Sequence, residues 1–287
     1  MAIFIDALVN IINSCDNACA FCFRAFRNND IMDLDTYSLI LSRLVNINID
    51  SICLTGGEPL DHPYLNKLLK TSNIYGISCS IITTAYGEYR LSKLEAIAQY
   101  LSHINISVNS KMVQSIGKTD LKIENNYNLF KFLSASGVSY SVNFIYFSLD
   151  ESEIESLLEI KEAFPGLDYD FSPLIIKPGE LSNFLLSDNT YIKTLKRDFK
   201  MLQKVFNFNK KYISRFHRYC NEYGKEIMLK CQYDRLFITT TGEIRTCPYN
   251  SSEIYIHNIA PGELKRSIIF NIKGQYRNAT ECNNLCY

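Results

Sequence analysis

The sequence has no tryptophan, few histidines and no excess of charge of either sign. Its four histidines follow no motif spacing, so we assign them no catalytic or metal-binding role. Acidic and basic residues are mixed and the formal net charge is +0, which argues against a nucleic acid or an anionic membrane as the main partner. No uninterrupted apolar run is long enough to span a bilayer, and the apolar N-terminal segment lacks a basic start and a proper cleavage site. We therefore expect a cytoplasmic, reduced protein without nucleic-acid or membrane partners.

Cysteine, in contrast, is abundant. Ten cysteines in a short secreted chain would indicate a disulfide framework, but this chain has 287 residues, and 47% hydrophobic residues are ample for a buried core. Most of the cysteines gather near the two ends of the chain in spacings typical of metal clusters. We therefore expect metal ligation rather than disulfide bonds.

The most informative motif is the triplet Cys15, Cys19 and Cys22, with the spacing C-x3-C-x2-C. Three thiolates this close can hold three irons of a four-iron cluster and leave the fourth iron without a protein ligand. An open coordination position is where chemistry can take place. From the spacing alone, a zinc knuckle stays an alternative.

Segments typical of strands and helices alternate along residues 1 to about 185. The expected strands are 3–12, 51–54, 77–83, 103–108, 140–147 and 168–173, and the expected helices are 35–45, 64–71, 92–100 with Ser92 as N-cap, 124–135 and 151–164. Such repeated β/α units predict parallel strands with outer helices. We expect an α/β fold, a partial (β/α)6 TIM-like barrel that stays open, with functional residues at the carboxyl ends of the strands.

A second motif, Gly56-Gly57-Glu58-Pro59, follows the second expected strand. Together with the cysteine triplet and Phe21 directly before its third cysteine, this motif resembles the radical S-adenosylmethionine (SAM) superfamily. The resemblance implies that the amino and carboxylate groups of SAM fill the open iron position. It also implies that the turn contacts the amino group, with backbone groups of the glycines at close approach and Glu58 as hydrogen-bond acceptor.

Further positions match the superfamily more loosely. Thr84 follows the third expected strand, Ser107 and Asn109 end the fourth, and Asn143 lies on the fifth. The resemblance implies that these side chains lie near the ribose or carboxylate of SAM. Asn109 departs from the pattern because many relatives have aspartate there, although an amide oxygen can still accept a hydrogen bond. The sequence identifies no catalytic acid or base.

The C-terminal part contains a second group of cysteines. Cys231 and Cys247 flank two β-rich stretches joined by a turn at Gly242, which predicts a hairpin. With Cys282 and Cys286, this layout resembles the SPASM and twitch domains of radical SAM enzymes, and the shorter twitch form fits better. The resemblance implies four ligands for an auxiliary [4Fe-4S] cluster, and a zinc site with the same thiolates is the alternative.

The pattern divides the chain into a radical SAM barrel at 1–185, a helical linker at 186–229 and an auxiliary-cluster domain at 230–287. Cys220 lies just upstream of the last domain and is a possible replacement for one of its ligands. Cys53 and Cys79 lie within expected strands, where we expect both thiols in the core.

The resemblance implies reductive cleavage of SAM to a 5′-deoxyadenosyl radical, which abstracts hydrogen from the substrate. The auxiliary cluster would then accept an electron from the substrate radical, making the net reaction an oxidation, with an electron donor such as flavodoxin or ferredoxin as partner. We expect a ribosomally made peptide as substrate. A small molecule such as an aminocyclitol or sugar alcohol in natural-product biosynthesis is the first alternative, and a non-catalytic metal-binding module is an alternative of another class.

Overall fold

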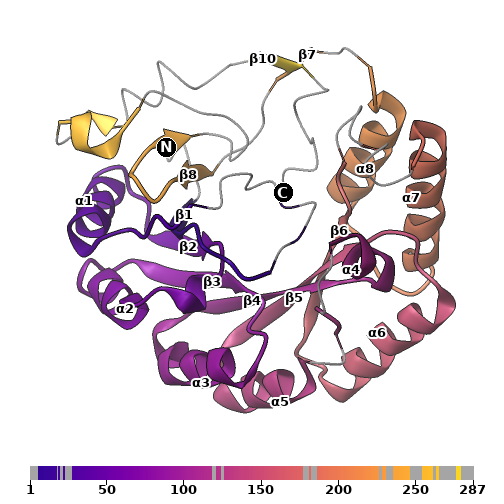
Figure 1. Ribbon diagram of the computed structural model, residues 1–287, viewed down its shortest axis with the longest axis horizontal. Helices are drawn as coiled ribbons and strands as arrows, with labels where there is room; N and C mark the ends of the chain where they lie inside the picture. Colours follow the sequence, from indigo (N-terminus) through magenta and orange to yellow (C-terminus); the bar gives the residue numbers. More distant parts are fainter. Residues whose placement is uncertain are drawn as a thin grey trace.

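The computed structural model describes residues 6–17, 19, 22, 28–117, 121–123, 126–176, 181, 186–225, 228–230, 235–245, 254–260, 263–264 and 276–278. Its main element is an eight-stranded sheet with the strand order β6-β5-β4-β3-β2-β1-β8-β9. The first six strands pair in parallel and are β1 Ala7–Ile12, β2 Ser51–Gly56, β3 Ser78–Thr83, β4 His103–Asn109, β5 Ser139–Tyr146 and β6 Asp168–Pro173. The sheet is curved and does not close on itself, so the expected open partial barrel is confirmed (Figure 1).

Helices follow the strands and cover the outer face of the sheet (Figure 1). The short helix α4, Lys111–Gly117, lies inside this outer row and contacts β4 and β5 (Figure 1). The outer helices are α1 Leu34–Val45, α2 Leu65–Ile74, α3 Glu88–Ile97, α5 Tyr127–Ser136 and α6 Glu151–Ala163. Two of them begin at strong caps. The Asp33 side chain accepts from the backbone N–H of Thr36, and Asp150 forms a capping box with Glu153.

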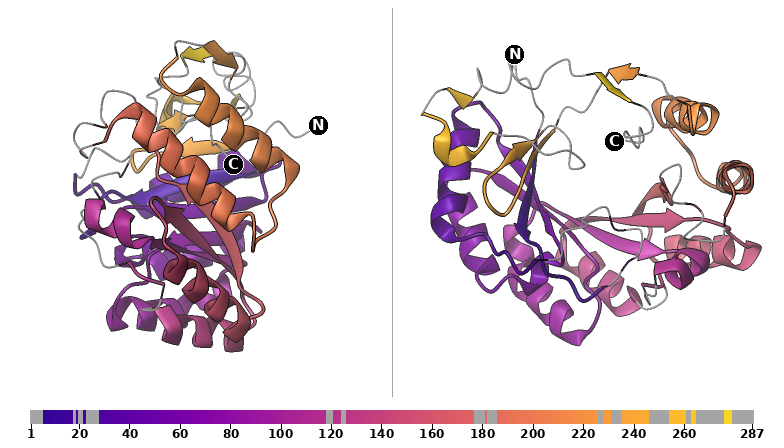
Figure 2. Two further views of the ribbon diagram at one scale, coloured as in Figure 1. Left: turned by 90° about the vertical axis from the view of Figure 1, so that its right-hand side faces the viewer. Right: turned by 45° about the horizontal axis from the view of Figure 1, so that its top comes forward.

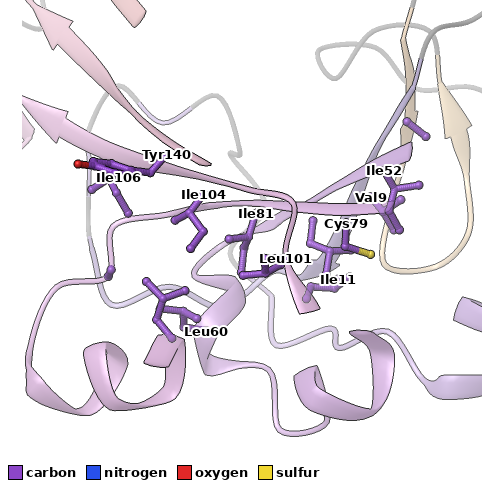
Figure 3. Packing of buried hydrophobic residues seen from close by; sticks show 14 of the residues in the cluster. Val9, Ile11, Ile52, Leu60, Cys79, Ile81, Leu101, Ile104, Ile106 and Tyr140 are labelled. Carbon is purple, nitrogen blue, oxygen red and sulfur yellow. The ribbon is translucent and has the colours of Figure 1, made fainter. Parts of the chain in front are cut away.

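The core lies between the sheet and these helices. Alternate strand residues such as Ile81, Ile104 and Ile106 are fully buried on the helix side of the sheet (Figure 3). Side chains alternate between the two faces of a strand, so the residues between them point to the inner, concave face. One face is therefore an apolar packing surface, and the other is free to carry a site.

Two further helices, α7 Asp188–Leu202 and α8 Lys210–Glu222, pack together beside β6 (Figure 2). Aromatic rings join them, with Phe199 and Phe216 at a centroid distance of 4.1 Å. The hydroxyl of Tyr191 donates to the carbonyl oxygen of Leu174, which ties α7 to the segment that follows β6. Helices were expected in this region, whereas the domain boundaries at 185 and 229 stay a prediction.

Two local features differ from expectation. The third helix begins at Glu88 and not at Ser92, which lies exposed within the helix and caps nothing. The helix instead starts from Gly87, whose φ of 92° lets the chain turn into it at no steric cost. The short helix α4 was not expected, because its seven residues are too few to show the spacing of apolar residues that predicts a helix.

The C-terminal part adds two strands to the barrel sheet. Strand β8, Leu236–Ile238, pairs with β1 in parallel, and β9, Ile244–Arg245, pairs with β8 antiparallel. The expected hairpin is thus confirmed. Its pairing with β1 was not expected from the sequence. The strands β7 Met228–Lys230 and β10 Tyr276–Asn278 form a separate antiparallel pair. In the part of the chain that is described, no helix is long and apolar enough to cross a membrane.

Candidate active site

The cysteine triplet lies on the loop that leaves the carboxyl end of β1. Cys15 and Cys19 are half-buried and Cys22 is exposed, and all three are free thiols. The backbone N–H of Cys22 donates to the carbonyl oxygen of Cys19 at 3.1 Å, so these two residues form one tight turn. Phe21 lies outside the described residues. Burial, and to a smaller extent the nearby charge of Glu58, raises the pKa of Cys15.

The two glycines let a second loop pass directly against this cysteine loop. The backbone N–H of Gly57 donates to the carbonyl oxygen of Ile12 at 2.5 Å, and that of Glu58 donates to Ser14 at 3.1 Å. A Cβ atom on Gly57 would lie 1.8 Å from the Ser14 carbonyl oxygen, and one on Gly56 would lie 2.5 Å from the Ile12 carbonyl oxygen. Glycine is therefore required at both positions because the two loops lie in close backbone contact. From the sequence, the close approach had been expected toward SAM.

Glu58 is almost fully buried and joins the glycine loop to the end of β3. Its Oε1 accepts from the backbone N–H of Leu60 at 3.1 Å and from Thr83 Oγ1 at 2.5 Å. Its Oε2 accepts from the backbone N–H of Thr84 at 3.0 Å and from Thr84 Oγ1 at 2.8 Å. These donors occupy the four lone-pair positions of a carboxylate. The charge is thus already stabilised within the protein, and Pro59 directly after it begins the short 3₁₀ helix η1, Pro59–Asp61.

Arg90 of α3 connects the same two loops from the outer side. Its Nη2 donates to Asp16 at 2.8 Å and to Asp61 at 2.6 Å, and its Nε donates to the second carboxylate oxygen of Asp61 at 3.1 Å. Arg90 is only 7% exposed. Burial alone would lower the pKa of Arg90, but its hydrogen bonds to Asp61 and Asp16 outweigh burial and raise it. Sequence reasoning missed this contact, because an arginine and two aspartates far apart in the chain carry no motif.

Of the four side chains predicted to lie near the ribose or carboxylate of SAM, three lie on the inner face of the sheet and the fourth follows β3. Ser107 of β4 and Asn143 of β5 are neighbours in register, and Asn143 Oδ1 accepts from Ser172 Oγ at 2.8 Å. Asn109 ends β4 and is buried. Thr84 accepts from Asn17 of the cysteine loop at 3.4 Å, which places it beside the triplet. The structure therefore brings Thr84 next to the cysteine loop and groups the other three on adjoining strands.

The inner face of β4 to β6 is mainly polar, with Ile145 of β5 as an apolar member at its carboxyl end. Its polar residues are His103, Asn105, Ser107 and Asn109 of β4, Ser139, Ser141 and Asn143 of β5, and Asp168, Asp170 and Ser172 of β6. Asn105 Nδ2 donates to Asp170 at 3.2 Å, and Ser141 Oγ donates to the same oxygen at 3.4 Å. Desolvation raises the pKa of Asp170. A closed barrel packs this space with branched apolar side chains, so the polar lining here is suited to a polar ligand.

The C-terminal hairpin contacts the cysteine loop. Asn13 Nδ2 donates to Thr240 Oγ1 in the hairpin turn at 3.2 Å, and Arg235 pairs with Asp6 at 2.9 Å at the other end of β8. Gly242 lies under η5, Ile256–Asn258, where a Cβ atom would meet Ile256 at 2.6 Å. The hairpin is therefore fixed on the barrel. The four expected auxiliary ligands, Cys231, Cys247, Cys282 and Cys286, lie outside the described residues.

The other described cysteines occupy three different surroundings. Cys79 is buried on the helix side of β3, as expected for a core thiol. Cys53 lies in β2 as expected but on the inner face of the sheet, where it is half-buried and outside the core. Burial raises the pKa of its thiol to about 11. Cys220 of α8 is buried in the aromatic cluster, and burial raises its pKa to about 11. Those apolar surroundings are typical of a structural thiol.

Among the described side chains, no three Cys, His, Asp or Glu groups are placed to hold one metal ion together. A four-iron cluster makes a different demand, because each thiolate binds a separate iron at its own corner. Cys15, Cys19 and Cys22 supply the soft thiolate donors that iron–sulfur clusters use, on a loop with its third thiol exposed. The donor set therefore fits a cluster with three protein ligands.

Comparison with known proteins gives a family and two groups of relatives. The sequence profile of the radical SAM superfamily matches residues 9–160. A GTP 3',8-cyclase of Clostridium perfringens is 25% identical over 224 residues, which are 72% of this chain and 68% of that protein. GTP 3',8-cyclase 1 of Mycobacterium tuberculosis is 24% identical over 151 residues, 42% of each chain. The chain thus spans less than half of the mycobacterial protein.

Solved structures share the fold at low sequence identity. SuiB of Streptococcus suis, bound to its precursor peptide SuiA, matches with a TM-score of 0.59 and 16% identity over 99% of this chain and 64% of its own. The protein anSMEcpe, with bound AdoMet and a Kp18Cys peptide, matches with a TM-score of 0.64 and 14% identity over 93% of this chain and 81% of its own. These likenesses confirm the open β/α barrel.

Proposed function

Because the chain belongs to the radical SAM superfamily, whose profile covers residues 9–160, we propose that Cys15, Cys19 and Cys22 hold a [4Fe-4S] cluster and that loop 56–59 positions SAM beside it. When bound, the cluster and SAM supply hydrogen-atom abstraction from the substrate. Membership of this superfamily makes the chain an enzyme, in place of the non-catalytic module considered from the sequence. The observation that carries the proposal is the pair of backbone hydrogen bonds from Gly57 and Glu58 to the residues just before Cys15.

The protein's own residues contribute position and surroundings. Loop 56–59 is held against the cysteine loop by backbone contacts, and Glu58 fixes it to the end of β3. We assign Ser107, Asn109 and Asn143 to the sugar and carboxylate groups of SAM, because their amides and hydroxyl line the inner face beside β3. A site assembled from strand ends and short loops keeps reacting groups in a fixed orientation.

Substitution of the triplet tests this assignment. Cys15→Ala, Cys19→Ala and Cys22→Ala should each abolish formation of 5′-deoxyadenosine from SAM in the anaerobically reconstituted, dithionite-reduced protein. Cys79→Ala is the matched control, because its thiol lies in the core away from the loop, and it should retain product formation. Product formation at the wild-type rate in any triplet variant would refute the assignment.

We further assign Cys231, Cys247, Cys282 and Cys286 to an auxiliary [4Fe-4S] cluster that makes the net reaction an oxidation. Support comes from the hairpin of β8 and β9, which is docked on β1 and has Gly242 in its turn, as the twitch spacing requires. Iron, sulfide and zinc content of the reconstituted protein tests this. About eight irons per chain, at about four for each cubane, supports it, whereas about four irons with one zinc makes the C-terminal site a zinc site.

For the substrate we propose a ribosomally made peptide, with flavodoxin or ferredoxin as electron donor. SuiB and anSMEcpe, which share the fold, were solved with peptides bound. The relatives named GTP 3',8-cyclase suggest a nucleotide instead. The described inner face of β4 to β6 carries Asp170 and amides but neither lysine nor arginine, the side chains that commonly pair with phosphates. The polar lining therefore favours a peptide or an uncharged polyol.

The substrate class is tested by direct incubation. Reduced enzyme and SAM, incubated with a ribosomally made precursor peptide from the same genome, should give 5′-deoxyadenosine together with a peptide lighter by two hydrogens. GTP and an aminocyclitol serve as parallel substrates under the same conditions. Turnover of GTP but not of the peptide would overturn the peptide proposal, and turnover of the aminocyclitol alone would establish the small-molecule alternative.

A further inference from the structure

A buried arginine lies between two loops that belong to the proposed site. Arg90 is contributed by α3, which carries none of the sequence motifs, yet its guanidinium reaches one carboxylate in the cysteine loop and another in η1, which begins at the end of loop 56–59. Asp16 is the residue directly after Cys15, and Asp61 lies two residues after Pro59. One nitrogen, Nη2, donates to both carboxylates, at 2.8 Å and 2.6 Å. The two loops are thus joined through a single side chain.

The two carboxylates differ in what their pairing contributes. The contact with Asp61 is bidentate and partly buried, and it holds the arginine in one orientation. The side chain of Asp16 is 67% exposed, so its pairing with Arg90 buries little surface and contributes little to folding. What the Asp16 contact does is restrict the backbone next to Cys15. On the other side of that loop, Asn17 donates to Thr84 at 3.4 Å, so the loop is held at two successive residues.

We propose that Arg90 is a positioning residue for the iron–sulfur cluster, holding the loop of Cys15 and Cys19 in register with loop 56–59 through Asp16 and Asp61. This inference rests on the proposed cluster ligands. Partners of metal ligands commonly change metal affinity about 10- to 100-fold when they are removed. Lysine cannot replace the arginine fully, because a point charge with one nitrogen cannot form the bidentate bond to Asp61 and also reach Asp16.

The test measures retention of iron by the holoprotein. Wild type, Arg90→Gln, Arg90→Lys and Asp16→Asn are reconstituted anaerobically and exposed to a ferrous chelator, and the rate of iron release is followed. The triple variant Cys15→Ala/Cys19→Ala/Cys22→Ala gives the iron that belongs to any other site. Arg197→Gln is the matched control, because it removes an arginine paired with a buried aspartate, Asp198, on α7. The electron paramagnetic resonance spectrum of the reduced protein is recorded with and without SAM.

We expect Arg90→Gln to release the iron held by the cysteine triplet at least about tenfold faster than wild type. Arg90→Lys should release it at an intermediate rate, and Arg197→Gln at the wild-type rate. The spectral change caused by SAM should be lost or altered in Arg90→Gln. Because the Asp16 side chain is exposed, Asp16→Asn should fold even if the arginine variants do not. It should also release iron faster than wild type.

Two outcomes separate the failure of this inference from failure of the proposed function. If the triple cysteine variant retains as much iron as wild type, the proposed ligands are wrong. If the triple variant loses that iron while Arg90→Gln and Asp16→Asn release it at the wild-type rate with an unchanged SAM-dependent spectrum, the positioning role of Arg90 is refuted and the ligands stand.

Discussion

The carbonyl oxygen of Ser14 lies 1.8 Å from the place where a side chain on Gly57 would begin. No rotamer relieves such a clash, because both partners are backbone and the same backbone groups are hydrogen-bonded to each other's loops. The two motifs of the site are therefore in direct contact, and this contact depends on the absence of one Cβ atom on Gly57.

Gly57→Ala should separate the cysteine loop from loop 56–59. Overpacking of this kind costs about 1–3 kcal/mol where the structure can adjust. We expect a lower unfolding temperature of the apoprotein and a loss of SAM binding measured by equilibrium dialysis. Gly166→Ala is the control, since a Cβ atom there meets only the Tyr140 hydroxyl at 3.9 Å. Unchanged SAM binding by Gly57→Ala would show that the loops can move apart without consequence.

Replacing Glu58 with glutamine should weaken the junction between loop 56–59 and β3. Glutamine brings an N–H₂ group to a place where both Thr84 groups donate, so at least one buried donor loses its acceptor. The cost of such a loss is about 1–3 kcal/mol, measured from urea unfolding of the apoprotein. Glu95→Gln, an exposed change on α3, should shift the free energy of unfolding by less than about 0.5 kcal/mol. Equal effects of the two variants would argue against this bonding.

Asp170 should make stability depend on pH. Desolvation raises its pKa in the folded state, so the folded protein binds this proton more tightly than the unfolded chain does. This contribution is present below the ordinary carboxyl pKa and is lost as pH rises through the raised value. Asp170→Asn should therefore gain unfolding temperature over wild type as pH rises from about 4 to about 8. A difference that is constant across this range, or equal to that of the exposed control Asp50→Asn, would contradict the expectation.

Cys220 should resist alkylation in the folded apoprotein. A thiol with a pKa of about 11 is only about one part in a thousand thiolate at pH 8. Iodoacetamide followed by peptide mass spectrometry should label Cys22, which is exposed, long before Cys220. Labelling of both at the same rate would place Cys220 outside the aromatic cluster, and labelling of both in urea confirms that the assay detects them.

Much of the barrel is predictable from the sequence, because its strands and helices have short, clear apolar patterns. The strand 168–173 was predicted to the residue, and the helix expected at 35–45 begins one residue earlier at Leu34. The start of α3 was missed for a physical reason. Its first turn contains Arg90, a charged residue that is buried only because two aspartates from other loops neutralise it, and a local pattern cannot show such partners.

The site was predictable as motifs but not as contacts. The cysteine triplet and the turn at 56–59 were found because each is continuous in sequence. Thr83 as partner of Glu58, and the close approach of Gly57 to Ser14, depend on how neighbouring loops cross, which the spacing of residues does not contain. For the same reason the hairpin was expected, but its pairing with β1 was not.

That pairing has a consequence for the order of folding. Ala7 meets Leu236, so β1 has an unpaired edge while the six β/α units are being synthesised and folded. A long-range partner arrives late, because the chain between the two strands must close a large loop first. Until then an apolar parallel strand presents free backbone groups, which invites pairing between nascent chains. Slower translation, which lets β8 dock before chains accumulate, should therefore raise the yield of soluble protein.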